Sequence, residues 1–222
     1  MNKQDKNHLD HAVERLLASR DKAKKQYFIE RITYLWNPKE RFTLRALPAG
    51  VFTEESVKAV ISFADDDSED VRRAVAQALG TSDQIANIGR ETLEKLLSDK
   101  SSLVRFHAAT SSSQRGQFNK MPQTFIESLL EDSVWSVRWL ASMSLANSDL
   151  NKKAWATVIS SVPSHPLHLI IWSKAALKLA KLREEKLQVK GILEKCIASE
   201  EDDCLTGWAK ADLDEINQSL QM

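Results

Sequence analysis

Apolar residues recur along this chain at helical spacing, in pairs of short amphipathic segments that are separated by polar turns. The clearest pair covers residues 123–146. Its apolar side chains fall at short intervals in both halves: Phe125, Ile126, Leu129 and Leu130, then Val137, Ala141 and Leu145. Intervals of three and four residues place such side chains on one face of an α-helix. The stretch therefore predicts two helices joined by a turn at residues 131–136.

The same pattern recurs with a period of 33 residues in the centre of the chain. In each copy an aspartate in the turn is followed five residues later by Val and six residues later by Arg. The aspartates and arginines are Asp66, Asp99, Asp132, Arg72, Arg105 and Arg138. Weaker copies around Phe42, Ile171 and Leu205 keep the apolar positions and lose the polar pair. A period of this length is typical of a solenoid of helix pairs.

The segments VRRAVAQAL, VRFHAATSS and VRWLASMSL, each preceded by its turn aspartate, resemble HEAT repeats. They are most similar to the short bacterial subtype that is also found in phycobilin lyases. The resemblance is clear over residues 52–148, and the flanking copies depart from it. It implies an all-α fold, a right-handed α-solenoid of about six antiparallel helix pairs. It also implies a scaffold and does not indicate an activity.

Residues 1–222 are expected to form a single domain. A helix over residues 1–22 is expected to cap the open N-terminal end. The repeats are expected approximately at residues 23–50, 51–84, 85–118, 119–151, 152–184 and 185–222. Six Gly, five Pro and few alternating apolar runs favour helices over strands. Whether residues 5–35 form one helix or two stays open, because Ser19, Arg20 and Asp21 are a weak break.

The charges balance only as an average, with 31 basic and 31 acidic residues. Residues 1–50 contain eleven Lys or Arg against six Asp or Glu, and residues 51–100 contain six against eleven. A surface that binds duplex DNA normally needs clustered Lys and Arg, so zero net charge disfavours nucleic acid without removing it. No leader-like apolar region and no run of ~20 apolar residues is present. We therefore expect a cytoplasmic protein without a membrane partner.

No catalytic constellation is recognisable in the sequence. It contains no HExxH, no GxSxG and no phosphate-binding Gly loop. Cys196 and Cys204 lack metal-type spacing, and His165 and His168 have no cluster of carboxylates or thiols beside them. We expect no catalytic residue, no metal and no cofactor. An enzyme is disfavoured but stays open.

The six turn residues Asp66, Arg72, Asp99, Arg105, Asp132 and Arg138 form what we call the turn ladder. The resemblance implies a structural role, in which carboxylate and guanidinium pair bidentately across the turn and between stacked repeats. A row of arginines that binds phosphates is the alternative. It is weakened because each arginine has an aspartate at fixed spacing.

A second candidate site lies on the second helix of each repeat. If the Val, Ala and Leu positions face the core, the residues two, three and six positions after the Val face outward along the concave surface. Large apolar side chains on an exposed row mark binding sites. The predicted groove residues are Arg73, Phe106, His107, Trp139, Leu140, Met143, Lys174 and Trp208. The alternative, that the rotation is off by one residue or that the rings pack as core, stays open.

These observations favour a non-enzymatic protein–protein interaction module of the adaptor, chaperone-like, or inhibitor and immunity type. Its concave face would hold a helix or an extended peptide of a partner protein. One alternative is a nucleic-acid-binding helical-repeat protein similar to alkylpurine DNA glycosylases. Another is a chromophore lyase subunit, which the repeat subtype alone suggests. The sequence does not indicate which partner is bound, the pathway or the oligomeric state.

Overall fold

The computed structural model describes residues 3–36, 53–162, 166–199 and 203–221. Over these residues the protein contains thirteen α-helices, one short 3-10 helix and no strand. The predicted all-α fold is confirmed. The chain divides into two compact units, Met1–Met121 (unit 1) and Pro122–Met222 (unit 2), which are described separately. The expected single domain and its repeat boundaries stay predictions.

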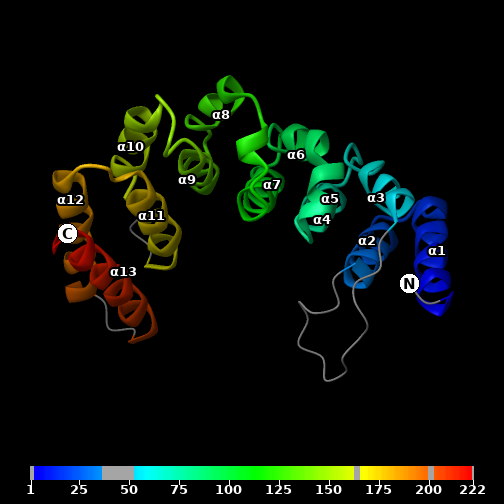
Figure 1. The fold of residues 1–222 in the computed structure, drawn as a ribbon. Helices are drawn as coiled ribbons and strands as arrows, with labels where there is room; N and C mark the ends of the chain where they lie inside the picture. The colour runs from blue at the N-terminus through cyan, green and yellow to red at the C-terminus, as the bar shows by residue number, and fades with distance from the viewer. Residues whose placement is uncertain (1–2, 37–52, 163–165, 200–202, 222) are drawn as a thin grey trace. The chain divides into compact units, whose positions relative to one another are not determined.

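Unit 1 consists of two layers of helices (Figure 1). The first layer contains α1, α3, α5 and α6, and the second contains α2, α4 and α7. In the second layer α2 packs on α4 and α4 packs on α7, while α1 packs on both α2 and α3. The elements are α1 (Lys3–Ala18), α2 (Lys22–Trp36), α3 (Glu54–Ile61), α4 (Glu69–Leu79), α5 (Asp83–Ile88), α6 (Arg90–Leu96), α7 (Ser102–Gln114) and η2 (Phe118–Lys120).

The N-terminal stretch forms two helices. Asp21 starts α2 by accepting a hydrogen bond from the backbone N–H of Lys24 at 2.9 Å through its side chain, as an N-cap residue does. Leu9, Leu16 and Ile29 are fully buried between the helices of this end of unit 1. The second half of the predicted repeat 23–50 falls on residues 37–52, outside the described residues.

Helix α3 begins at a capping box. The side chain of Thr53 accepts a hydrogen bond from the backbone N–H of Ser56 at 3.2 Å, and the Ser56 hydroxyl accepts one from the Thr53 N–H at 3.1 Å. Two backbone donors that the helix itself leaves unpaired are thereby satisfied. The cap places Val57 and Val60 in the core, where both are fully buried.

The end of α4 lies very close to α7. A side chain at Gly80 would place its Cβ 2.4 Å from the Ser111 hydroxyl oxygen, so only glycine fits there. The same hydroxyl donates to the Ala76 carbonyl at 2.8 Å. This contact fixes the spacing of α4 and α7, the two helices that carry the unit 1 part of the candidate site.

Unit 2 repeats the two-layer arrangement (Figure 1). Its second layer is formed by α9, α11 and α13, with α11 packed on both of the others. The elements are α8 (Gln123–Leu129), α9 (Trp135–Ser144), α10 (Asn151–Ile159), α11 (Pro166–Leu179), α12 (Arg183–Ser199) and α13 (Asp203–Gln221). Trp172 of α11 is fully buried and donates its indole N–H to the Val158 carbonyl at 2.8 Å. None of the described helices combines the length and the apolar character that crossing a bilayer requires.

Candidate binding face and turn ladder

Three turns of the chain share one hydrogen-bond arrangement. Each ladder aspartate accepts, through Oδ1, a bond from the backbone N–H two residues later, at 2.9, 2.8 and 2.7 Å for Asp66, Asp99 and Asp132. Each ladder arginine donates from Nη1 to the backbone carbonyl of the aspartate six residues before it, at 2.8, 2.8 and 2.7 Å. The short Asp side chain therefore shapes the turn, and the guanidinium satisfies a carbonyl that the turn leaves open.

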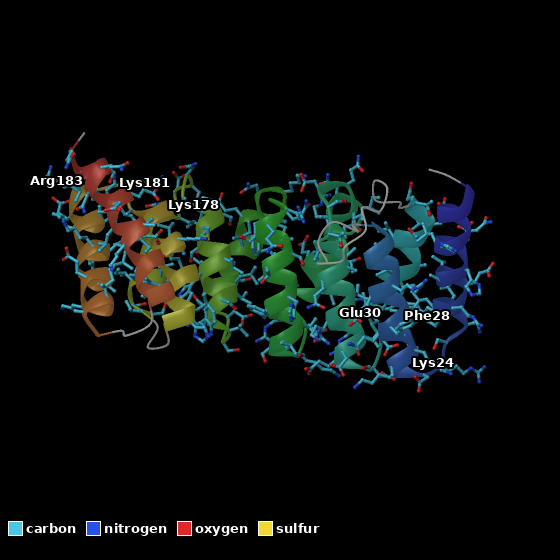
Figure 2. The ribbon with its side chains drawn as sticks, turned by 90° about the horizontal axis from the view of Figure 1, so that it is seen from below. Lys24, Phe28, Glu30, Lys178, Lys181 and Arg183 are labelled. Atoms are coloured by element: carbon cyan, nitrogen blue, oxygen red, sulfur yellow. The ribbon has the colours of Figure 1, made fainter. Side chains whose placement is uncertain are left out.

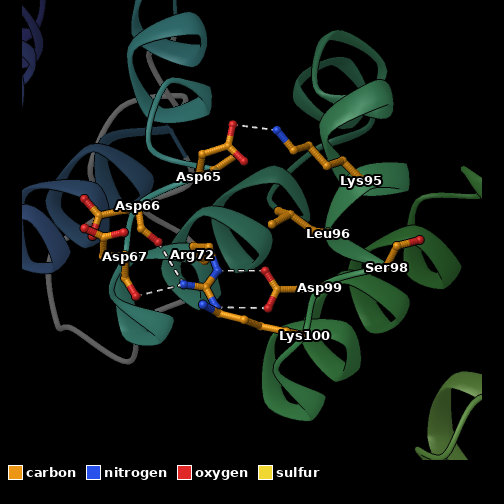
Figure 3. A pocket seen from close by; sticks show the side chains of 10 residues that line it. Asp65, Asp66, Asp67, Arg72, Lys95, Leu96, Ser98, Asp99 and Lys100 are labelled. Atoms are coloured by element: carbon orange, nitrogen blue, oxygen red, sulfur yellow. Dashed lines mark hydrogen bonds and ion pairs between the residues drawn. The ribbon is translucent and has the colours of Figure 1, made fainter.

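Arg72 also joins two consecutive helix pairs of unit 1. Its Nε and Nη2 donate to the two carboxylate oxygens of Asp99 at 2.7 and 3.0 Å (Figure 3). Burial by itself would raise the pKa of Asp99, but the bonds from Arg72 and from the Ser101 N–H hold this pKa below its ordinary range. The bond to Asp99 raises the pKa of Arg72. The carboxylate is thus ionised, and the pair has the bidentate geometry expected between stacked repeats.

Lys25 of α2 occupies the corresponding position one helix pair earlier. Its ammonium group binds the Asp66 carboxylate and lies 5.5 Å from the centre of the Phe63 ring. Burial by itself would raise the pKa of Asp66, but the bonds from Lys25 and from the Ser68 N–H lower it. In unit 1, Lys25 therefore connects α2 to the turn at Asp66, and Arg72 connects α4 to the turn at Asp99.

A cavity of about 410 Å³ opens beside these turns (Figure 3). Its lining includes four carboxylates and three cationic side chains, which largely neutralise one another. Lys95 pairs with Asp65 at 2.5 Å, and Arg72 pairs with Asp99. Among the described residues no group of three or more His, Cys, Asp or Glu is placed to hold a metal ion. The charged side chains that line the cavity therefore pair with one another and hold the turns together, and they do not form an ion-binding site.

Four side chains are joined on the exposed side of α4 and α7, and we call them the unit 1 face. They are Arg73, Gln77, Phe106 and His107. Arg73 Nη1 donates to Gln77 Oε1 at 3.3 Å, and Gln77 Nε2 lies 3.2 Å from His107 Nδ1. The rings of Phe106 and His107 meet edge to face with their centroids 4.9 Å apart. The structure thus brings together three of the predicted groove residues, Arg73, Phe106 and His107.

The direction of these hydrogen bonds indicates which ring nitrogen of His107 carries the proton. A guanidinium can only donate, so Gln77 Oε1 accepts from Arg73 and the amide nitrogen of Gln77 points to the imidazole. That nitrogen also only donates, so His107 Nδ1 accepts and the ring proton lies on Nε2. Burial of the ring, and then the positive charge of Arg73, lower the pKa of His107. The unit 1 face therefore presents a neutral imidazole.

Trp139 is part of the core. Its side chain is 1% exposed, its ring centroid lies 4.5 Å from that of Trp135, and its indole N–H donates to the Ser161 hydroxyl at 2.8 Å. The predicted exposure of this ring is wrong, because position two after Val137 on α9 is covered by neighbouring helices. Ser173, at the corresponding position of α11, is also fully buried.

The unit 2 face consists of the outward side chains of α9 and α11. Leu140, Met143 and Leu177 are partly exposed, and Lys174 is exposed. The predicted groove residues Leu140, Met143 and Lys174 thus reach the surface. Trp208 lies on α13, but its side chain is outside the described residues.

Comparison with known proteins agrees with this arrangement. Residues 57–146 match the family model of HEAT repeats. This central part of the chain is similar to HEAT repeats. A designed armadillo repeat protein is similar over 94% of this chain and 99% of its own, with 17% identity and a TM-score of 0.56. An archaeal HEAT-like repeats protein from Thermococcus onnurineus NA1 is similar over 99% of this chain and 94% of its own, with 13% identity and a TM-score of 0.56.

No curated protein matches the chain. At such low identities the two structural similarities establish a repeat-solenoid fold and nothing about a ligand. Solenoid folds of this kind commonly mediate protein interactions. The phycobilin-lyase-like subtype and the handedness of the superhelix stay predictions.

Sequence reasoning missed several side chains at and beyond the edges of the matched HEAT repeats. Lys25 was missed because the repeat expected at residues 23–50 would make α2 its first helix, whereas α2 packs in the second layer against α4. Lys178 and Lys181 were missed because the outward positions of α11 were set from its apolar anchor Ile171. Lys178 follows Lys174 by four residues, the spacing that places two side chains on one helix face, and Lys181 lies just beyond the end of α11.

Proposed function

We propose that this protein is a non-enzymatic interaction module that binds a segment of a partner protein on the exposed side of its second helices. An adaptor, a chaperone-like protein, or an inhibitor or immunity protein would each fit this proposal. HEAT repeats support this proposal, because stacked helix pairs present long surfaces that suit an elongated ligand. The observation that carries the proposal is the unit 1 face, where a partly exposed phenylalanine adjoins a neutral imidazole on a rigid pair of helices.

The chemistry of the unit 1 face suits a polypeptide. Phe106 supplies an apolar contact, and its ring packs edge to face on His107, which is bonded to Gln77. Gln77 uses one of its two amide protons for His107, so the second can be donated to a ligand carbonyl. Preorganised aromatic and amide groups of this kind lower the entropic cost of binding a peptide.

Affinity capture tests the proposal. Wild-type protein and the Phe106→Ala variant are used as bait in nuclease-treated lysate of the source organism, and retained proteins are identified by mass. Leu103→Ala is the matched control, because Leu103 is also an apolar residue of α7 and is 41% exposed. We expect a protein that wild type and the control retain and that Phe106→Ala loses. Equal capture by all three proteins would show that the unit 1 face is not the binding surface.

A further inference from the structure

The exposed side of α11 carries a row of lysines. Lys174 and Lys178 lie four residues apart on this helix, and Lys181 follows three residues later, just after its end (Figure 2). All three are exposed. The opposite side of α11 is buried, with Trp172, Ala175 and Leu179 fully covered. Lys174 and Lys178 therefore project from one side of the helix. Lys181 lies beyond its end, where its ammonium group donates to Asn147 Oδ1 at 3.2 Å. We call these three residues the lysine row.

Among the described residues, Lys174 and Lys178 have no acidic partner. Neither α9 nor α11 contains an Asp or a Glu. Asp212 of α13 is 9% exposed and accepts the Ser173 hydroxyl at 2.7 Å. Glu185 of α12 accepts the backbone N–H groups of Lys181 and Leu182 at 2.6 and 2.9 Å. Within the described part of unit 2, no carboxylate pairs with Lys174 or Lys178.

Apolar side chains accompany these cations. Leu177 lies between Lys174 and Lys178 in the sequence of α11 and is partly exposed. Helix α9, which packs on α11, adds Leu140 and Met143, both partly exposed. The exposed side of α9 and α11 therefore combines positive charge with apolar side chains that a ligand could contact.

The proposed function implies a protein ligand, and on that basis we propose that the lysine row binds an acidic, leucine-containing segment of the partner. Carboxylates of the segment pair with Lys174 and Lys178, and its apolar side chains contact Leu177 and Met143. Complementary charge then selects the partner and speeds its association.

Fluorescence anisotropy with synthetic probes tests this inference. The probes are a short fluorescein-labelled peptide of Glu and Leu, the same peptide with every Glu replaced by Lys, and a labelled oligothymidine of similar length. The test variant is K174E/K178E. The control is K152E/K195E, which changes the net charge equally at exposed lysines of the first-layer helices α10 and α12. Far-ultraviolet circular dichroism checks folding, and K174Q/K178Q replaces the test variant if the charge reversal unfolds unit 2.

We expect wild type to bind the Glu-Leu peptide and not the Lys-Leu peptide. K174E/K178E should weaken this binding about tenfold or more, because two attractive pairs become repulsive, and the control should leave it unchanged. Absence of binding by wild type, or equal weakening in both double variants, would overturn the inference. Oligothymidine binding that depends on Lys174 and Lys178, without peptide binding, would assign the row to nucleic acid and overturn it too.

The outcome is separable from that of the proposed function. A natural partner that K174E/K178E still captures, and that Phe106→Ala loses, would refute the acidic segment and leave the interaction module intact. Capture that neither variant affects would refute both.

Discussion

The guanidinium of Arg72 and the carboxylate of Asp99, 27 residues apart in the sequence, form a two-pronged ion pair. Their side chains are only 6% and 9% exposed. Arg72 Nη1 donates in addition to the Asp66 and Asp67 carbonyls at 2.8 and 3.1 Å. One side chain therefore connects the turn after α3 to the turn after α6.

Removing this guanidinium should destabilise unit 1. Arg72→Ala is expected to lower the free energy of unfolding by about 3 kcal/mol, because the Asp99 carboxylate would stay buried without its charged partner. Arg72→Lys should recover only part of the loss, since an ammonium cannot reproduce the fork of two N–H groups. Urea unfolding measures both changes.

Arg73→Ala is the control for that measurement. Arg73 is the next residue of α4, and its contact with Asp70 is long, at 3.8 Å, and more exposed than the Arg72–Asp99 pair. We expect a loss below about 1 kcal/mol. If Arg72→Ala cost no more than Arg73→Ala, the turn ladder would not be a stabilising feature.

The carboxylates of the turns should make the stability of the fold depend on pH. The pKa values of Asp66 and Asp99 are lowered in the folded protein, so folding favours their ionised forms. Their contribution is complete above the unfolded-state pKa of about 4 and is lost as the pH falls through the lower folded-state values. Urea midpoints between pH 6 and about 3 should therefore fall more steeply for wild type than for Asp99→Asn. Parallel curves would contradict the ionised Arg72–Asp99 pair.

The turns could be predicted from the sequence because their chemistry is local. An aspartate that accepts the N–H two residues later, and an arginine six residues later that reaches its carbonyl, need a fixed spacing along one chain. That spacing recurs at Asp66, Asp99 and Asp132. Pairing of carboxylate and guanidinium between stacked repeats was implied by the resemblance to HEAT repeats, and the structure shows it for Arg72 and Asp99.

The rotation of each second helix could not be predicted in this way. The residue two positions after the Val anchor is partly exposed on α4, as Arg73, but buried on α9, as Trp139. Three positions after the anchor, Ala74 is buried and Leu140 is partly exposed. Packing against neighbouring helices decides which of these positions is covered, and a template carried from repeat to repeat assumes one rotation for all.

His107 should titrate below an ordinary histidine. Burial and the charge of Arg73 both disfavour the imidazolium, so the folded-state pKa should lie under about 6.5. The stability that the neutral ring contributes is complete above the unfolded-state pKa of about 6.5. It is lost as the pH falls from there through the lower folded-state pKa. NMR titration of the His107 ring measures this pKa, and the ring nitrogen shifts should show the proton on Nε2 at neutral pH.

The Arg73→Gln variant tests whether the charge of Arg73 contributes to the lowered pKa of His107. It removes the positive charge but leaves the ring buried, so the pKa of His107 should rise and stay below that of an exposed histidine. A titration unchanged by Arg73→Gln would mean that burial alone sets the pKa. A proton on Nδ1 would contradict the chain of bonds from Arg73 through Gln77 to His107.

Substitutions at Trp139 test most directly whether this ring belongs to the core or to the binding face. Because the ring is buried and its N–H is bonded to Ser161, Trp139→Ala should lower the free energy of unfolding by about 3–5 kcal/mol. Trp139→Phe, which keeps most of the ring volume and loses the hydrogen bond, should cost about 1–2 kcal/mol. Phe106→Ala should cost less than Trp139→Ala, because the Phe106 ring is already partly solvated. Urea unfolding ranks the three variants, and partner capture is then measured at a temperature where all remain folded. Loss of capture by folded Trp139→Phe with full capture by Phe106→Ala would reverse the assignment of these two rings.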